Sequence, residues 1–111
     1  MVAESSLPAP VQRFVDAINA ADTDAFVDAF TPDGLVDDWG RELHGPDGLR
    51  SWADTDAIGM NARITILSAD VDGDTVTTRF DWASRRFNGR SEGIFVIAGD
   101  RLSSFTIPPH R

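Results

Sequence analysis

Asp38 is the residue of this sequence best placed for proton-transfer chemistry. In residues 34–39, Val36 and Asp38 fall on one face of an expected strand, because successive strand side chains alternate. If Val36 faces the core, the Asp38 carboxylate reaches an apolar interior. Burial there would raise its pKa and suit it to act as a general acid or base. In the alternative, Leu35 and Trp39 form the buried face and Asp38 lies at a solvated strand end.

A second arrangement would activate water for epoxide opening, a reaction that uses two carboxylates with an arginine between them. Asp38, Arg79 and Asp81 could supply such a set. Arg79 and Asp81, however, fall on the strand face opposite to Phe80 and Trp82, so they would point away from an apolar pocket. We therefore do not assign epoxide hydrolysis to these three residues.

Metal and thiol chemistry have little support in the sequence. There is no cysteine, which excludes disulfides, thiolate metal sites and cysteine nucleophiles. The two histidines, His44 and His110, lack acidic partners at ligand spacing, so we expect no metal and no cofactor. His44 is typical of a turn histidine just before a helix.

Apolar spacing predicts three helices in the first half of the chain. The first carries apolar residues three or four positions apart, which is the pattern of an amphipathic helix. That stripe consists of Val11, Phe14, Val15 and Ile18. The second helix is expected to begin at Thr23 as its N-cap and to end before Pro32, and the third to open at residues 45–47.

The rest of the chain indicates strands. Residues 34–39 and 41–44 suit a short strand pair, and from Asn61 the period changes to two over four further strands. A two-residue turn at Asn88-Gly89 is the strongest hairpin signal. It predicts three cross-strand pairs, Trp82 with Phe95, Phe80 with Ile97, and Arg85 with Glu92.

Two more details of the sheet follow from the sequence. A three-residue loop at 71–73 would place Ile64 and Ile66 on the face that carries Phe80 and Trp82. In the last strand the apolar residues break parity, which predicts a β-bulge near residues 103–104.

Together these elements predict one α+β domain over residues 1–111, with residues 1–6 as a frayed tail. Three N-terminal helices would cover one face of a curved antiparallel sheet and enclose a pocket. The expected lining residues are Phe14, Ile18, Val36, Trp52, Phe80, Trp82, Phe95 and Ile97. On the opposite face Ile94 and Val96 stand in a row, and from this we expect a homodimer.

Charge narrows the classes of partner. The 111 residues carry 18 acids and 10 bases, a formal net charge of −8. Nucleic acids and anionic membranes bind to basic surfaces, so we expect neither as a partner. The sequence has no apolar run of membrane-spanning length and no secretory signal at its start, which makes a cytoplasmic protein the expectation.

Several segments in order resemble the SnoaL-like branch of the nuclear transport factor two-like superfamily. The likeness rests on residues 14–22, 30–34, 38–40, 44–52 and 99–102. It implies a cone-shaped α+β fold with a deep apolar pocket, often in a homodimer. Members include ketosteroid isomerases, polyketide cyclases, epoxide hydrolases, dehydratases and binding domains, so the family does not decide the activity.

The resemblance also implies departures from the isomerases. Their general base resembles Asp38 by position, but their oxyanion-stabilising tyrosine falls at Phe14, and the chain has no tyrosine. Their second donor, an aspartic acid, falls near Glu92-Gly93, where no aspartate stands. The segment 88–93 also lacks the histidine and acid of the cyclases. Steroid isomerisation and cyclase chemistry are therefore unsupported.

Two functions of different classes remain. The first is a SnoaL-like domain of unknown specific activity that binds a small apolar molecule in its internal pocket. The alternative is a cofactor-independent isomerase, dehydratase or hydrolase that uses Asp38 as its general acid or base. A second polar group within hydrogen-bond reach of Asp38, inside a cavity, is the observation that would favour the enzyme.

Overall fold

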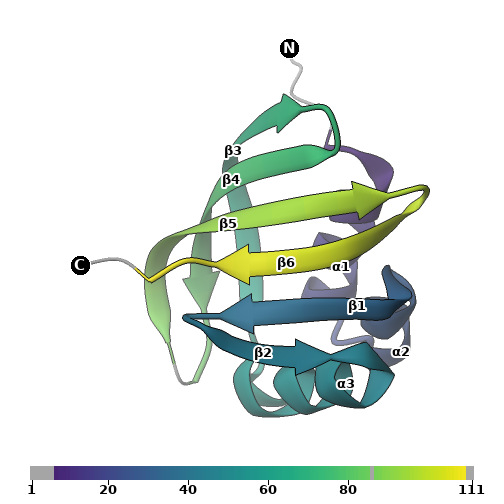
Figure 1. Ribbon diagram of the computed structural model, residues 1–111. Helices are drawn as coiled ribbons and strands as arrows, with labels where there is room; N and C mark the ends of the chain where they lie inside the picture. Colours follow the sequence, from purple (N-terminus) through teal and green to yellow (C-terminus); the bar gives the residue numbers. More distant parts are fainter. Residues whose placement is uncertain (1–6, 86, 110–111) are drawn as a thin grey trace.

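Three α-helices cover one face of a curved six-stranded sheet (Figure 1), which confirms the expected α+β fold. The computed structural model describes residues 7–85 and 87–109, so the expected frayed tail and His110 lie outside the described residues. The helices are α1 (Ala9–Asn19), α2 (Thr23–Asp28) and α3 (Gly45–Asp56), with a short 3-10 turn at Ile58–Met60. The strands are β1 (Phe30–Asp38), β2 (Arg41–His44), β3 (Arg63–Asp72), β4 (Thr75–Ala83), β5 (Asn88–Ala98) and β6 (Arg101–Ile107).

The second helix differs from its prediction at both ends. Asp22, not Thr23, is the N-cap, because its carboxylate accepts a hydrogen bond from the Ala25 N–H at 3.1 Å. The helix ends at Asp28, and Pro32 lies inside β1. The pairing of β1 with β6 is interrupted between residues 30 and 35, so the missing N–H of Pro32 costs no ladder hydrogen bond.

The strand order is β2-β1-β6-β5-β4-β3, and it contains one parallel pair. The expectation of an entirely antiparallel sheet is therefore wrong for β1 and β6. The chain leaves β1 through β2 and α3, forms the β3–β6 meander, and returns with β6 beside β1 in the same direction. The β1–β6 pair thereby joins the β1–β2 hairpin to the β3–β6 meander in one sheet.

The β4–β5 hairpin has a different turn from the one predicted. Ser84 closes a wider turn, since its N–H donates to the Phe87 carbonyl at 3.0 Å and its hydroxyl oxygen accepts from the Phe87 N–H at 2.9 Å. Asn88 and Gly89 consequently belong to β5. The predicted pairs Trp82–Phe95, Phe80–Ile97 and Arg85–Glu92 are wrong. The observed partners are Trp82 with Gly89, Phe80 with Ser91, Val76 with Phe95, and Arg79 with Glu92.

Each side chain still lies on the predicted face of the sheet, because the observed β4–β5 register differs from the predicted one by an even number of positions. Ile64 lies opposite Trp82, and Ile66 lies opposite Phe80, which confirms that these side chains share one face. The loop before β4 is Gly73-Asp74, because Asp72 already pairs with Thr75. The bulge at residue 103 is confirmed, since the β5–β6 register shifts there.

Phenylalanine fills the space between the helices and the middle of the sheet. The ring of Phe14 lies 4.6 Å from that of Phe105, 5.0 Å from Phe95, 5.4 Å from Phe26 and 6.1 Å from Phe30, measured between centroids. All five side chains are at most 2% exposed. Such tilted aromatic pairs add to the free energy already gained from burial. This phenylalanine cluster is the centre of the core.

One side chain fastens the helical layer to the edge strand β3. Asn19, at the end of α1, donates from Nδ2 to the Ile64 carbonyl at 3.0 Å, and its Oδ1 accepts from the Ile64 N–H at 2.8 Å. The side-chain amide thus completes the hydrogen bonds of a strand that has no neighbour on that side.

Replacing Asn19→Ala should lower the free energy of unfolding by about 1–3 kcal/mol, because both partly buried Ile64 groups lose their partner. Gln12→Ala is the matched control, since its amide bonds only Asp16 on the exposed side of the same helix. Chemical denaturation measures both variants. Equal losses for the two would show that Asn19 does not fasten α1 to the sheet.

Candidate functional site

The site is a cavity of about 520 Å³ at the open end of the domain, between the β1–β2 turn, α3 and the β4–β5 turn. All three tryptophans of the sequence line it. The lining residues are Asp38, Trp39, Arg41, Trp52, Asp56, Phe80, Trp82, Phe87, Asn88, Gly89, Arg90, Ser91 and Ile107. Five of these residues are aromatic. Asp38, Arg41 and Asp56 gather on the side of β1, β2 and α3, and Arg90 lines the cavity from β5.

Trp52, Phe80 and Trp82 line this cavity as expected from the sequence, but the other predicted lining residues do not. Phe14, Ile18, Val36 and Phe95 are at most 1% exposed and belong to the closed core. Ile97 packs against the edge of that core. The physical reason is the phenylalanine cluster, whose closely packed rings fill the space between α1 and the middle of the sheet.

Asp38 lies on the inner face of β1 together with the fully buried Val36, and its carboxylate reaches the cavity. The Trp52 indole N–H donates to Asp38 Oδ2 at 3.1 Å. Arg41 lies directly opposite on β2, with its guanidinium 3.6 Å from the same oxygen. The side chain of Asp38 is 18% exposed, so water reaches it only in part.

Asp56 and Arg41 are site residues that the sequence analysis missed. Arg41 donates to Asp56 Oδ2 at 2.8 Å, and the Thr55 hydroxyl donates to Asp56 Oδ1 at 2.5 Å. Asp56 is only 5% exposed. The available signal was an acid at the last position of a helix, where the helix dipole disfavours negative charge and a compensating cation is needed.

The surroundings of Asp38 raise its pKa above the ordinary value of 3.8. Desolvation by burial is the main cause, and the neighbouring Asp56 carboxylate adds to it. The Trp52 N–H and the Arg41 guanidinium oppose the increase without cancelling it. Asp38 therefore holds a proton more readily than an exposed aspartate does.

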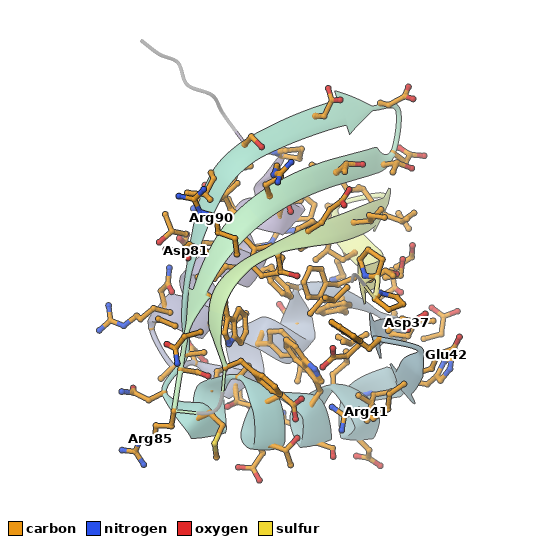
Figure 2. All side chains as sticks on the ribbon, turned by 90° about the vertical axis from the view of Figure 1, so that its left-hand side faces the viewer. Asp37, Arg41, Glu42, Asp81, Arg85 and Arg90 are labelled. Carbon is orange, nitrogen blue, oxygen red and sulfur yellow. The ribbon has the colours of Figure 1, made fainter. Side chains whose placement is uncertain are left out.

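An acid–arginine–acid set exists here, but it consists of Asp38, Arg41 and Asp56. Arg79 and Asp81 lie on the outer face of β4, opposite to Phe80 and Trp82 in the strand alternation. Arg90 pairs across the sheet with Asp81 on that outer face. Figure 2 shows Asp81 and Arg90 side by side, and Arg41 on the other side of the aromatic side chains.

The turn between β1 and β2 brings a third tryptophan to the cavity. Trp39 and Gly40 both have positive φ, 56° and 87°, as a two-residue hairpin loop requires. Asp37 supports the turn by accepting from the Gly40 N–H at 2.8 Å. Glycine or asparagine is usual in such a backbone conformation, and a tryptophan there is uncommon.

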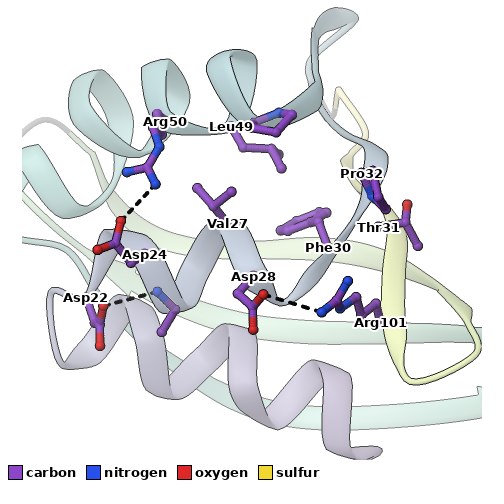
Figure 3. A pocket seen from close by; sticks show the side chains of 12 residues that line it. Asp22, Asp24, Val27, Asp28, Phe30, Thr31, Pro32, Leu49, Arg50 and Arg101 are labelled. Carbon is purple, nitrogen blue, oxygen red and sulfur yellow. Dashed lines mark hydrogen bonds and ion pairs between the residues drawn. The ribbon is translucent and has the colours of Figure 1, made fainter.

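A second and larger cavity, of about 740 Å³, lies between α2, α3 and the start of β6 (Figure 3). Four of its charged lining groups form ion pairs, since Arg50 bonds Asp24 at 2.8 Å and Arg101 lies 3.4 Å from Asp28, and the fifth, Asp22, caps α2. These pairs are exposed, with side-chain exposures of 42–85%. The Asp38 cavity combines apolar walls with buried charge and is the better candidate site.

The remaining sequence candidates lie apart from this cavity. His44 is exposed, and its Nε2 lies 3.0 Å from Glu42 Oε1. Within residues 7–85 and 87–109, no group of three or more acidic or histidine side chains could hold a metal ion. None of the described helices is both long and apolar enough to cross a membrane.

The raised pKa of Asp38 makes the folded state less stable as pH rises from about 4 through that pKa, because the folded chain binds the proton more tightly than the unfolded chain. Asp38→Asn should remove this contribution, so the variant gains stability relative to the wild type above the raised pKa. Denaturation of both proteins across this pH range measures the difference. A difference that does not change with pH would place the Asp38 carboxylate in a solvated environment.

Comparisons with known proteins agree with the fold described above. The model of the SnoaL-like domain family matches residues 11–104. A structure described as a polyketide cyclase from Sinorhizobium meliloti is 28% identical, with a TM-score of 0.80 over 91% of this chain and 94% of that chain. None of the functionally curated proteins compared with the chain matches it.

Two further structures share the fold at lower identity. A protein from Catenulispora acidiphila with a ketosteroid isomerase-like fold, in complex with trimethylamine, is 20% identical, with a TM-score of 0.78 over 94% of this chain and 87% of that chain. A computationally designed 17-OHP binder is 12% identical, with a TM-score of 0.80 over 96% of this chain and 93% of that chain. The chain belongs to the SnoaL-like domain family.

Proposed function

We propose that the protein binds a small, mainly apolar molecule in the Asp38 cavity. The observation that carries the proposal is a cavity of about 520 Å³ with five aromatic side chains in its walls and the charged groups Asp38, Arg41 and Asp56 together on one side. Small-molecule sites are commonly this size, with apolar walls and a few polar groups that orient the ligand. A structure of similar fold in complex with trimethylamine and a designed 17-OHP binder of similar fold support the binding of a small molecule.

A substitution at Ser91 can reduce the cavity volume without removing any charged side chain. Ser91 lines the cavity from β5, opposite Phe80, and Ser91→Phe should fill part of the space. The neutral apolar probe N-phenyl-1-naphthylamine should bind the wild type, quench tryptophan fluorescence, and bind the variant about tenfold more weakly. Thr65→Phe, an exposed change on β3 outside the cavity, is the control. Equal affinities in all three proteins would contradict the proposal.

Acid–base catalysis by Asp38 is the second candidate. A second polar group within hydrogen-bond reach of Asp38 favours it, and the cavity supplies Trp52 Nε1 at 3.1 Å together with Asp56 and Arg41. Asp38 would exchange the proton with the substrate or with water, and Asp56 with Arg41 would hold the charge beside it. Isomerisation, dehydration and hydrolysis all use such a step.

Steroid isomerisation is not part of this candidate. Phe14 carries no hydroxyl, and its fully buried ring lies in the phenylalanine cluster, away from the cavity. At Gly93, a Cβ atom would lie 2.7 Å from a carbon of the Phe105 ring and 2.8 Å from one of the Phe80 ring, so a larger acid does not fit there. Neither position supplies an oxyanion donor.

A panel of small epoxides, β-hydroxy ketones and β,γ-unsaturated ketones tests the catalytic candidate. Any turnover that depends on this site should fall about 100-fold or more in Asp38→Asn, the usual effect of losing a general acid or base. Asp37→Asn is the control, because Asp37 lies next in sequence but outside the cavity lining. Turnover that Asp38→Asn leaves unchanged would remove Asp38 from the mechanism.

We also propose a homodimer formed through the outer face of the sheet. Ile94 and Val96 are half-buried there, and their cross-strand neighbours are small, Thr77 and Thr106 beside Ile94, and Ser104 beside Val96. A surface on which two apolar side chains stand among small neighbours suits a symmetric contact between two copies. Sedimentation measures the assembly directly.

A further inference from the structure

We infer that the ligand of the Asp38 cavity carries a positively charged nitrogen, as a protonated or quaternary amine on an apolar body. The inference rests on the proposed binding function and makes its ligand class specific. Two independent features of the cavity support it, the balance of its charged groups and the character of its walls.

The charged groups that face the cavity carry a net charge of −1. Asp38 and Asp56 supply two carboxylates, and Arg41 supplies one guanidinium. Arg90 also lines the cavity, but strand alternation directs its side chain to the outer face with Asp81. Arg41 is closer to Asp56, at 2.8 Å, than to Asp38, at 3.6 Å, so the excess charge resides mainly on Asp38.

The hydrogen bonds of the two carboxylates also favour a cationic ligand. The guanidinium of Arg41 and the indole N–H of Trp52 already donate to the two carboxylates. A ligand carboxylate would add a third negative charge beside the single Arg41 guanidinium. A carboxylate accepts about four hydrogen bonds, so Asp38 retains room for a further donor. A protonated amine brings both a donor and a positive charge, and a quaternary amine brings the positive charge alone.

The aromatic side chains of the cavity also favour a positively charged nitrogen. Five aromatic side chains line the cavity, namely Trp39, Trp52, Phe80, Trp82 and Phe87. The faces of aromatic rings attract cations, and tryptophan does so most strongly, so aromatic cages bind alkylated ammonium groups. Trp39 is held there in a left-handed backbone conformation, φ 56°, that tryptophan rarely adopts. Unusual backbone of this kind is frequent at binding sites.

The test compares two ligands of the same shape. Choline carries a trimethylammonium group, and 3,3-dimethyl-1-butanol replaces its nitrogen with carbon, so only the charge differs. The indole N–H resonances of the three tryptophans report binding, and that of Trp52 reports the bond to Asp38 directly. Choline should bind the wild type about tenfold more tightly than the alcohol.

Variants of Asp38 and Arg41 test whether these side chains cause the preference for choline over the alcohol. Asp38→Asn should abolish the preference for choline, while Asp37→Asn, which removes the same charge outside the cavity lining, should retain it. Arg41→Gln should increase the preference, because it removes the competing cation, and this variant keeps the test decisive if Asp38→Asn does not fold.

The outcomes separate the inference from the proposed function. If the alcohol binds as tightly as choline, the cationic ligand class is wrong and binding of small molecules stands. If choline is preferred equally in the wild type, Asp38→Asn and Asp37→Asn, the attraction comes from the overall negative charge and the inference is overturned. If neither choline, the alcohol nor N-phenyl-1-naphthylamine binds, both proposals fail.

Discussion

The packing of phenylalanine rings against one another is the constraint on which the rest of this structure depends. Phe14 touches rings from the second helix, the first strand and the two central strands, so one side chain holds together elements from the whole domain. Rings packed at this density leave no space for a ligand. The cavity therefore forms only where the cluster ends, towards the β1–β2 and β4–β5 turns.

Trp52 connects this core to the site. One face of its ring stacks on Phe26 at 5.7 Å, its edge approaches Phe105 at 6.1 Å, and its N–H holds Asp38. A side chain packed on the core has few rotamers available, so the position of the carboxylate is fixed by hydrophobic packing behind it. Arg41 and Asp56 then complete a charged network whose members each have a partner.

Features that depend on local periodicity were predictable, and those that depend on distant partners were not. The alternation correctly put Val36 and Asp38 on one face but left open whether that face was buried, and the even register shift left the faces of Phe80 and Trp82 unchanged. The Ser84 turn could not be predicted, because its hydrogen bonds compete with an equally plausible Asn-Gly turn. Asp56 could not be assigned either, since its cation comes from a strand that only the fold brings near.

The parallel pairing of β1 with β6 has a consequence for how the domain folds. Leu35 aligns with Ser104, so the middle of the sheet forms by closing a loop that spans most of the domain. Contacts of such long sequence separation slow folding, because the entropy of closing the loop is lost before the contact is gained. During synthesis on the ribosome, β1 and β2 must wait for β6 to emerge.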